Sequence, residues 1–345
     1  MTRPRSETIN DQVEGIQHCI SRCVRRAHLQ GEDPLTGNNY AHRKTWLHQR
    51  LIELSRIFYL DVCGYALMDN HLHTILRNRP DLAAKGSDRD VAVRWLKLFP
   101  KRSEPNDVPV EPSEDEVTLL LMDESRIKVL RKRLVSISWF HRCLKEFIAR
   151  KANAEDGCTG RFWEGRFKNM TLLDDAAVLT CLTYVELNPI RAKVAETPET
   201  SKFTSAEERI RGHLARCSNA SHGAWGILGE PTAAIETGCD DWLCPLRDTP
   251  DRRGFLPMDL EGYLELLDWT GRRLVAGKAG AIPDHLPPML TRLSVNHQQW
   301  LNSTRHFESM FFSVAGTETH MKQAAKRMGQ GWVRGLSAGK TAFLD

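Results

Sequence analysis

The segment that decides the fold runs from Phe58 to Arg77 and reads FYLDVCGYALMDNHLHTILR. Its first part is rich in β-branched and aromatic residues, and its last part, HLHTILR, alternates between polar and apolar residues. Both patterns are typical of β-strands. Asp69 and Asn70, which lie between them, favour turns. The sequence therefore predicts a hairpin with strands over Phe58–Met68 and His71–Arg77.

The segments around this hairpin alternate between strand and helix patterns. They predict a strand over Gln17–Val24, a helix over Asn38–Ile57, a long basic helix over Ser125–Asn153, a strand over Arg166–Leu173 and a helix from about Asp174 to Asn188. The order is strand, helix, strand, strand, helix, strand, with one further helix. This is the order of the split βαβ, ferredoxin-like arrangement, an α+β fold with helices on one face of an antiparallel sheet.

Two parts of the chain fall outside this arrangement. Approximately residues 79–125 are polar, acidic and proline-containing at their centre, which indicates an insertion. Beyond about Glu207 the helical patterns near Asp259–Ala276, His297–Val314 and Glu318–Arg327 predict a mostly helical C-terminal region. We therefore expect one domain over residues 14–205 and a helical accessory region over residues 206–345.

The composition excludes several classes of protein. The chain has 345 residues, of which 41% are hydrophobic and 27% are charged, so it can bury a sizeable core. Its longest apolar runs fall far short of the ~20 residues that a membrane span needs, and the N-terminal residues lack the apolar segment of a secretory signal. Nine cysteines, without a paired CxxC framework, favour reduced thiols in the cytoplasm.

The charge of the chain is unevenly distributed although the net charge is only +4. Acidic residues dominate between Lys101 and Ser125, whereas basic residues with interleaved aromatic rings dominate between Arg131 and Lys168. A second basic run, from Lys322 to Lys340, contains no acid. Such stretches suit a polyphosphate partner and stacking on unpaired bases. Solvated helix faces and core aromatic residues would give the same pattern, so charge by itself leaves both interpretations open.

The first candidate functional motif is His71-Leu72-His73. In a strand the two histidines project to the same face while Leu72 turns into the core. Two imidazoles so placed can hold one cation if a third group approaches from elsewhere. The same pattern also occurs as a surface pair or as a structural hydrogen-bonding pair, so the motif alone does not establish a metal site.

The second candidate motif is YVELNPIRA, residues 184–192. Tyr184 and Asn188 are four residues apart and therefore share one helical face with Thr180. A tyrosine hydroxyl, with an ordinary pKa of about 10, is a poor nucleophile. It becomes useful when a metal neutralises the phosphate that it attacks and a nearby group takes its proton. The alternative is a half-buried helix tyrosine followed by an ordinary Asn-Pro helix stop.

Together the two motifs resemble a known family. LMDNHLHTIL, residues 67–76, resembles the metal-binding strand of the His-hydrophobe-His (HUH) single-tyrosine transposases, although Asp69 stands where proline is more usual. GRFWEGRFKNMTLLDDAAVLTCLTYVELNPIRAKV, residues 160–194, resembles their tyrosine helix, and QHCISRCVRRAHL, residues 17–29, is similar to their first strand. Among these proteins the REP-associated tyrosine transposases are the most alike over residues 14–205.

The resemblance implies a ferredoxin-like fold and a chemistry. His71 and His73 would bind the metal, with Asn188 as a third, amide-bearing ligand, and Tyr184 would be the nucleophile. The family implies Mg²⁺ or Mn²⁺ as cofactor. It also implies a 5′-phosphotyrosine intermediate, and single-stranded or hairpin DNA as the partner. The reaction would serve DNA transposition or act on repeated palindromes, which places the enzyme on the DNA of a bacterial cytoplasm as a monomer or a homodimer.

Basic residues of the central stretch are the expected contacts to the DNA backbone. They are Arg131, Lys132, Arg133, Arg142, Lys145, Arg150, Arg161 and Arg166. The neighbouring Phe162 and Trp163 would either stack on bases or belong to the core.

Two other functions stay open at the level of sequence. A domesticated DNA-binding protein would recognise hairpins without cleaving them, and its binding would be indifferent to loss of Tyr184. A metal phosphoesterase that activates water on the two histidines would keep its hydrolysis after Tyr184→Phe.

Overall fold

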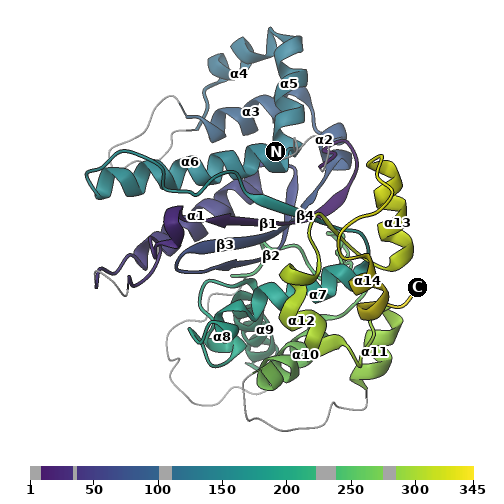
Figure 1. Cartoon of the computed structure of the whole chain (residues 1–345). Coiled ribbons are helices and arrows are strands. Elements are labelled where there is room, and N and C mark those ends of the chain that lie inside the picture. The colour runs from purple at the N-terminus through teal and green to yellow at the C-terminus, as the bar shows by residue number, and fades with distance from the viewer. Residues whose placement is uncertain (1–8, 34–36, 101–110, 223–237, 275–284) are drawn as a thin grey trace.

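The structure is a computed structural model that describes residues 9–33, 37–100, 111–222, 238–274 and 285–345 (Figure 1). Its strands are β1 (Gly15–Arg22), β2 (Leu60–Leu67), β3 (His71–Asn78), β4 (Lys168–Leu172) and β5 (Val314–Ala315). Its helices before β4 are the 3-10 turn η2 (Val24–Arg26), α1 (His42–Ile57), α2 (Pro80–Lys85), α3 (Asp88–Leu98), α4 (Glu114–Leu121), α5 (Glu124–Val135) and α6 (Ile137–Glu155). Those after β4 are α7 (Asp175–Glu186), α8 (Asn188–Arg191), the 3-10 turn η3 (Pro198–Thr200), α9 (Ser205–His222), α10 (Leu260–Leu274), α11 (Leu286–Arg292), α12 (Trp300–Met310), α13 (Glu318–Arg327) and α14 (Leu336–Ala342).

The strands form one mixed sheet with the order β2-β3-β1-β4-β5. β1 pairs antiparallel with both β3 and β4, and β2 pairs antiparallel with β3. Only β5 runs parallel to its neighbour, β4. The predicted hairpin is confirmed as β2 and β3, and the turn between them is closed by a hydrogen bond from the Met68 N–H to the His71 carbonyl, 2.8 Å long. The expectation of an α+β protein with a mostly antiparallel sheet is also confirmed.

Helices cover both faces of the sheet (Figure 1). α1 and α6 pack together on one face, and there they meet Leu72 and Leu76 of β3. α7 covers the opposite face, where it contacts Ile75. The expectation of helices on one face thus fits α1 and α6, whereas the further helix covers the other side. Because side chains alternate along a strand, His71 and His73 of β3 lie on the α7 face.

The prediction of one long helix over Ser125–Asn153 is wrong, because the helix is interrupted at Ser136 and forms α5 and α6. Ser136 has extended backbone angles, φ −81° and ψ 118°. The Leu134 carbonyl near the end of α5 accepts a hydrogen bond from the N–H of Tyr59, 2.9 Å away. The Asp11 carboxylate binds both the Ser136 side chain and the N–H of Ile137 at the start of α6. These contacts come from distant segments, so the local sequence, which has no glycine or proline here, does not reveal the break.

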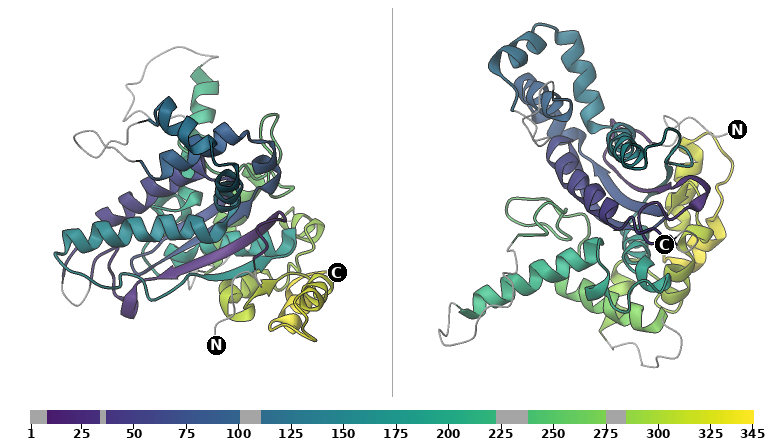
Figure 2. Two further views of the ribbon diagram at one scale, coloured as in Figure 1. Left: turned by 90° about the horizontal axis from the view of Figure 1, so that it is seen from above. Right: turned by 90° about the vertical axis from the view of Figure 1, so that its left-hand side faces the viewer.

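The predicted insertion is largely helical. It forms α2, α3 and α4, and α4 begins with a capping box in which Ser113 and Glu116 exchange hydrogen bonds. These helices pack on α5 and lie on the α1 and α6 side of the sheet, away from α7 (Figure 1 and Figure 2). The acidic residues Glu104 and Asp107 lie outside the described residues.

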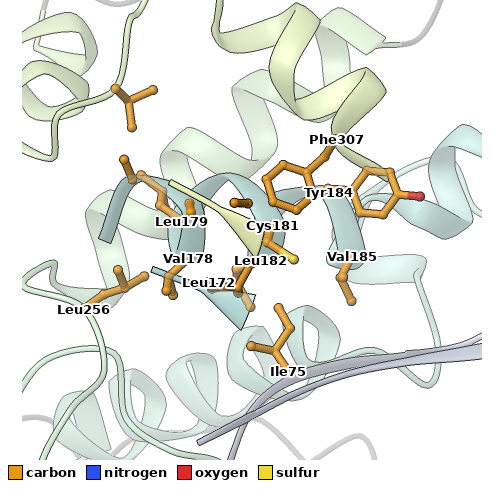
Figure 3. Packing of buried hydrophobic residues seen from close by; sticks show 14 of the residues in the cluster. Ile75, Leu172, Val178, Leu179, Cys181, Leu182, Tyr184, Val185, Leu256 and Phe307 are labelled. Carbon is orange, nitrogen blue, oxygen red and sulfur yellow. The ribbon is translucent and has the colours of Figure 1, made fainter. Parts of the chain in front are cut away.

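The C-terminal region packs against the sheet domain rather than apart from it. β5 adds a strand beside β4, and α12 packs on α7. Figure 3 shows Phe307 of α12 beside Tyr184 of α7. Trp300, Tyr263 and Phe307 of the C-terminal region are fully buried in the same cluster as α7. Residues of α7 from Ala176 to Glu186 are therefore all buried, and the helical face that Tyr184 shares with Thr180 is not exposed.

Two further observations bear on the expected class of protein. Within the described ranges, no helix has the length and apolar character required to cross a membrane. All nine cysteines are free thiols, as the sequence predicts.

Candidate active site

The site lies at one end of the sheet, on the face that α7 covers. Strand register sets which residues lie side by side in the site: His73 pairs with Ile20, and His71 pairs with Arg22, across β3 and β1. His18, two residues before Ile20, projects to the same face. Three histidines and an arginine thus share one end of a sheet whose other residues on this face are mostly apolar.

The structure brings the three predicted metal ligands together. The rings of His71 and His73 lie 4.9 Å apart between centroids. The Asn188 amide nitrogen is 3.0 Å from His73 Nε2. The Nδ1 atom of each ring also has an acceptor. His71 Nδ1 lies 2.6 Å from Asn70 Oδ1, and His73 Nδ1 lies 2.8 Å from His18 Nε2. In this network each of the two histidines donates from Nδ1 and keeps its Nε2 lone pair.

His18 is a site residue that sequence motifs did not identify. Its ring stacks on His73 with centroids 5.1 Å apart and an interplanar angle of 10°. It is buried, and its own Nδ1 has no hydrogen-bond partner among the described residues. The only sequence signal was its alternation with Ile20 and Arg22 in a strand, and that signal gains meaning only once β1 is known to pair with β3.

Burial sets the protonation of the histidines. Desolvation lowers the pKa of His18 to about 4 and that of His71 to about 4. The pKa of His73 is lowered well below its ordinary value, chiefly by desolvation and then by the neighbouring His71. The three rings are therefore neutral at pH 7, which is the state in which imidazole binds a metal.

Tyr184 lies next to this cluster. Its ring meets that of His73 edge-on, with centroids 5.9 Å apart. The hydroxyl donates a hydrogen bond to Oε2 of Glu308, 2.9 Å away. Burial, and then the charge of Glu308, raise the pKa of Tyr184. The Arg191 guanidinium lies over the tyrosine ring, 4.2 Å from its centroid.

Tyr184 and Asn188 reach the site from two helices instead of one. The helix predicted to continue to Asn188 ends at Glu186, and Asn188 starts the short helix α8. Pro189 explains the break, since it has no N–H and cannot continue the hydrogen-bonding pattern of α7. Both side chains nevertheless contact His73.

Glu308 is the second unexpected residue of the site, and it comes from the C-terminal region. It accepts from Tyr184 through Oε2 and from Arg22 through Oε1, the latter at 2.8 Å. The side chains of Arg22 and Glu308 are 24% and 30% exposed, so the pair lies where the site opens to solvent. Glu308 is 124 residues from Tyr184 in the chain, and no local pattern marks it.

The donor set can be compared with the expected metal. Within the described part of the chain, no group of three or more His, Cys, Asp or Glu side chains is arranged to hold a metal ion. The expected set contains an amide in place of a third such residue. Each neutral imidazole carries a lone pair on Nε2, and that of His73 accepts from the Asn188 amide. A turn of this amide about its terminal torsion would release that lone pair and present the amide oxygen. The residues thus fit a divalent ion, with His71, His73 and Asn188 as ligands.

The predicted DNA contacts lie apart from Tyr184, on α5, α6 and the loop before β4. Several of them have protein partners. Arg131 donates to the carbonyls of Ala83 and Gly86, Arg133 lies over Trp139, and Lys145 donates to the Gly165 carbonyl. The more exposed side chains are Lys132, Arg142, Arg150, Arg161 and Arg166.

The loop before β4 brings two of these arginines toward the site. Within this loop, Glu164 donates its N–H to the Arg22 carbonyl at 2.9 Å. Arg161 and Arg166, on either side of Glu164, are exposed near the end of β1. Phe162 and Trp163 are buried, so of the two roles considered for them, the structure supports the core.

We expect His18 to make folding stability depend on pH. Its folded pKa lies below its unfolded value of about 6.5, so the unfolded chain binds the proton first. The free energy of unfolding should therefore fall as the pH decreases from about 6.5 toward about 4. We expect His18→Asn to reduce the slope of the unfolding free energy against pH by the equivalent of up to one bound proton. Chemical denaturation at several pH values measures this slope. The same change at the exposed His297 is the control, and equal slopes in the two variants would contradict the prediction.

Comparisons with known proteins give one structural similarity. The chain resembles a solved structure described as a REP-associated tyrosine transposase bound to a REP hairpin, with a TM-score of 0.35 and 13% sequence identity. The match covers 68% of this chain and 98% of the other chain. No family model and no curated protein matches the sequence.

Proposed function

We propose that this chain is a DNA-processing enzyme that uses Tyr184 to cut and rejoin a single strand of DNA, acting on single-stranded or hairpin substrates as a transposase does. The observation that carries the proposal is the convergence of Tyr184, His71, His73 and Asn188 in one site, from one strand and two helices. Two motifs more than 100 residues apart in the sequence thus meet in one site, with Tyr184 beside His73.

The chemical step can be written from the side chains of the site. The Tyr184 oxygen attacks the phosphorus, its bond to phosphorus forms, and the bond from phosphorus to the 3′ oxygen breaks. The tyrosine proton passes to Glu308, which already accepts its hydrogen bond. The departing 3′ oxygen takes a proton from water and becomes a hydroxyl, and Glu308 returns its proton to the solvent. When bound, a divalent ion such as Mg²⁺ or Mn²⁺ polarises the phosphate and offsets its charge. The Arg22 and Arg191 guanidinium groups would bind the phosphate oxygens.

Strand order supports the finer fold assignment in this proposal. Residues 14–205 would form a ferredoxin-like HUH domain, in which a split βαβ arrangement requires the order β4-β1-β3-β2 with antiparallel pairs. β1 to β4 have this order, and α1 and α6 lie together on one face. The hairpin form of the substrate comes from the sequence resemblance. Residues 206–345 would then be an accessory region that also supplies Glu308 to the site.

The test is a covalent adduct between protein and DNA. A panel of labelled single-stranded hairpins with varied flanks is incubated with the protein and with Mg²⁺, Mn²⁺ or EDTA, and the products are separated on a denaturing gel. We expect a protein-linked band only when metal is present. His73→Ala should remove it, because the variant lacks one imidazole ligand, whereas the distant His297→Ala should keep it. An adduct that persists in EDTA would contradict the metal-dependent mechanism.

One observation favours a second function, a hairpin-binding protein that does not cleave. Tyr184 is only 4% exposed, and its hydroxyl is already engaged by Glu308. In this state the hydroxyl of the nucleophile is buried and bonded to a carboxylate instead of a phosphate. Tight hairpin binding without an adduct, under every metal condition and with the repeats of the source genome included in the panel, would favour this second function.

A further inference from the structure

Two large aromatic side chains are exposed on the C-terminal region. Phe312 is 66% exposed and Trp332 is 70% exposed, the highest values among the aromatic residues that the structure describes. Neighbouring aromatic residues such as Phe311 and Phe343 stack on each other in the core. Exposed rings of this size are costly in water, and a pair of them on one surface indicates a partner.

Phe312 and Trp332 line the same surface hollow. It has a volume of about 500 Å³, and its other lining residues include Met328, Val333 and Arg334. None of the residues that line it is acidic. A hollow with two aromatic walls and a cationic edge has the chemistry of a site for a nucleic-acid base and its phosphate.

The charge around the hollow fits an anionic partner. The Arg334 guanidinium lies 5.8 Å from the centre of the Phe312 ring. Lys326 and Arg327 are exposed in the last turn of α13, which leads directly to Met328. In the sequence no acid occurs between residues 319 and 344. Lys326, Arg327 and Arg334 form no ion pair within the described residues, so their charges are available to phosphate groups.

The hollow lies near the candidate active site, because Phe312 follows Glu308 of that site by four residues, just beyond the end of α12. β4 begins at Lys168, which is next to Ile20 on β1, and β1 ends at Arg22, opposite His71. β5 runs parallel to β4 and pairs with Thr171 and Leu172, the last two residues of β4. Phe312, two residues before β5, therefore lies on the side of β5 that is toward Lys168. Three strand spacings separate β3 from β5, a distance of roughly 15 Å. A DNA strand in the active site could reach the hollow within a few nucleotides.

We propose that Phe312, Trp332 and Arg334 form a binding site for unpaired nucleotides, in which bases stack on the two rings and phosphates contact the basic residues. The site would hold single-stranded DNA that flanks the segment to be cut. This inference takes its DNA partner from the proposed function, but it does not depend on cleavage by Tyr184.

The test measures binding of a labelled short oligothymidine by fluorescence anisotropy, in the full chain carrying Tyr184→Phe so that cleavage cannot interfere. Phe312→Ala and Trp332→Ala should each weaken binding at least about fivefold, since a stacked base contributes substantially to affinity. Trp332→Phe should keep most of the affinity, because stacking is retained. Blunt duplex of equal length should bind equally to all variants. The double change Leu119→Ala and Met122→Ala, which removes other exposed apolar side chains, serves as the matched control.

Three outcomes would overturn this proposal. Unchanged affinity for oligothymidine in both alanine variants would exclude stacking at this site. Equal losses for single strand and duplex would indicate a general effect on charge or folding. A change in sedimentation of the DNA-free protein, without a change in DNA binding, would assign the rings to a contact between two copies of the chain. Because binding is measured without cleavage, failure of the proposed nicking reaction would leave this test interpretable.

Discussion

Tyr184→Phe is expected to abolish the protein–DNA adduct while leaving hairpin binding within about twofold of the wild type. Loss of a catalytic nucleophile reduces rates by on the order of 10⁴-fold or more, because phenylalanine has no oxygen to form the bond to phosphorus. The rest of the site should persist. Glu308 keeps its ion pair with Arg22, and one lost hydrogen bond costs about 1 kcal/mol of stability. Denaturing electrophoresis measures the adduct, and anisotropy of a labelled hairpin measures binding.

A matched control for this variant is Tyr40→Phe. The Tyr40 hydroxyl accepts from Asn38 on the surface, 3.1 Å away, and takes no part in the site. This variant should form the adduct at the wild-type rate. Continued hydrolysis of DNA by Tyr184→Phe, without any adduct, would instead indicate a phosphoesterase that activates water. Loss of binding in the variant would show that the tyrosine acts in recognition.

Arg209→Ala is expected to lower the free energy of unfolding by about 3–5 kcal/mol, as removal of one partner of a buried ion pair does. Arg209 of α9 donates to Glu186 at 2.8 Å and to the carbonyls of Cys63 and Cys244. Glu186 is fully buried and also accepts from Ser205 and Tyr263. Without Arg209, Glu186 would remain buried without a compensating charge. Urea denaturation followed by circular dichroism measures the change.

The neighbouring Arg211 on the same helix supplies the control. Its side chain is 48% exposed and pairs with Glu207 one turn away. Surface pairs of this kind contribute about 0.3–0.5 kcal/mol, so Arg211→Ala should unfold close to the wild-type denaturant concentration. Equal losses in the two variants would mean that helix α9, rather than the buried ion pair, determines the effect.

Elements defined by local patterns could be predicted from the sequence. The β2–β3 hairpin follows from β-branched and alternating residues around a turn of Asp69 and Asn70, and α1 and β4 begin and end within a few residues of their predicted bounds. The break at Ser136 could not be predicted, because Tyr59 and Asp11 cause it from distant positions. The short strand β5 could not be predicted for a similar reason, since its two residues form a strand only by pairing with β4.

The candidate site divides in the same way. The sequence by itself determined that His71 and His73 share a face, and that Tyr184 and Asn188 lie one turn apart near a proline, because strand alternation and helical spacing are local properties. Only the tertiary structure decided that these two motifs meet. It also decided that His18 forms a hydrogen bond with His73, and that Glu308 of α12 accepts a hydrogen bond from the Tyr184 hydroxyl. Those contacts depend on strand register and helix packing, which join residues that no local pattern connects.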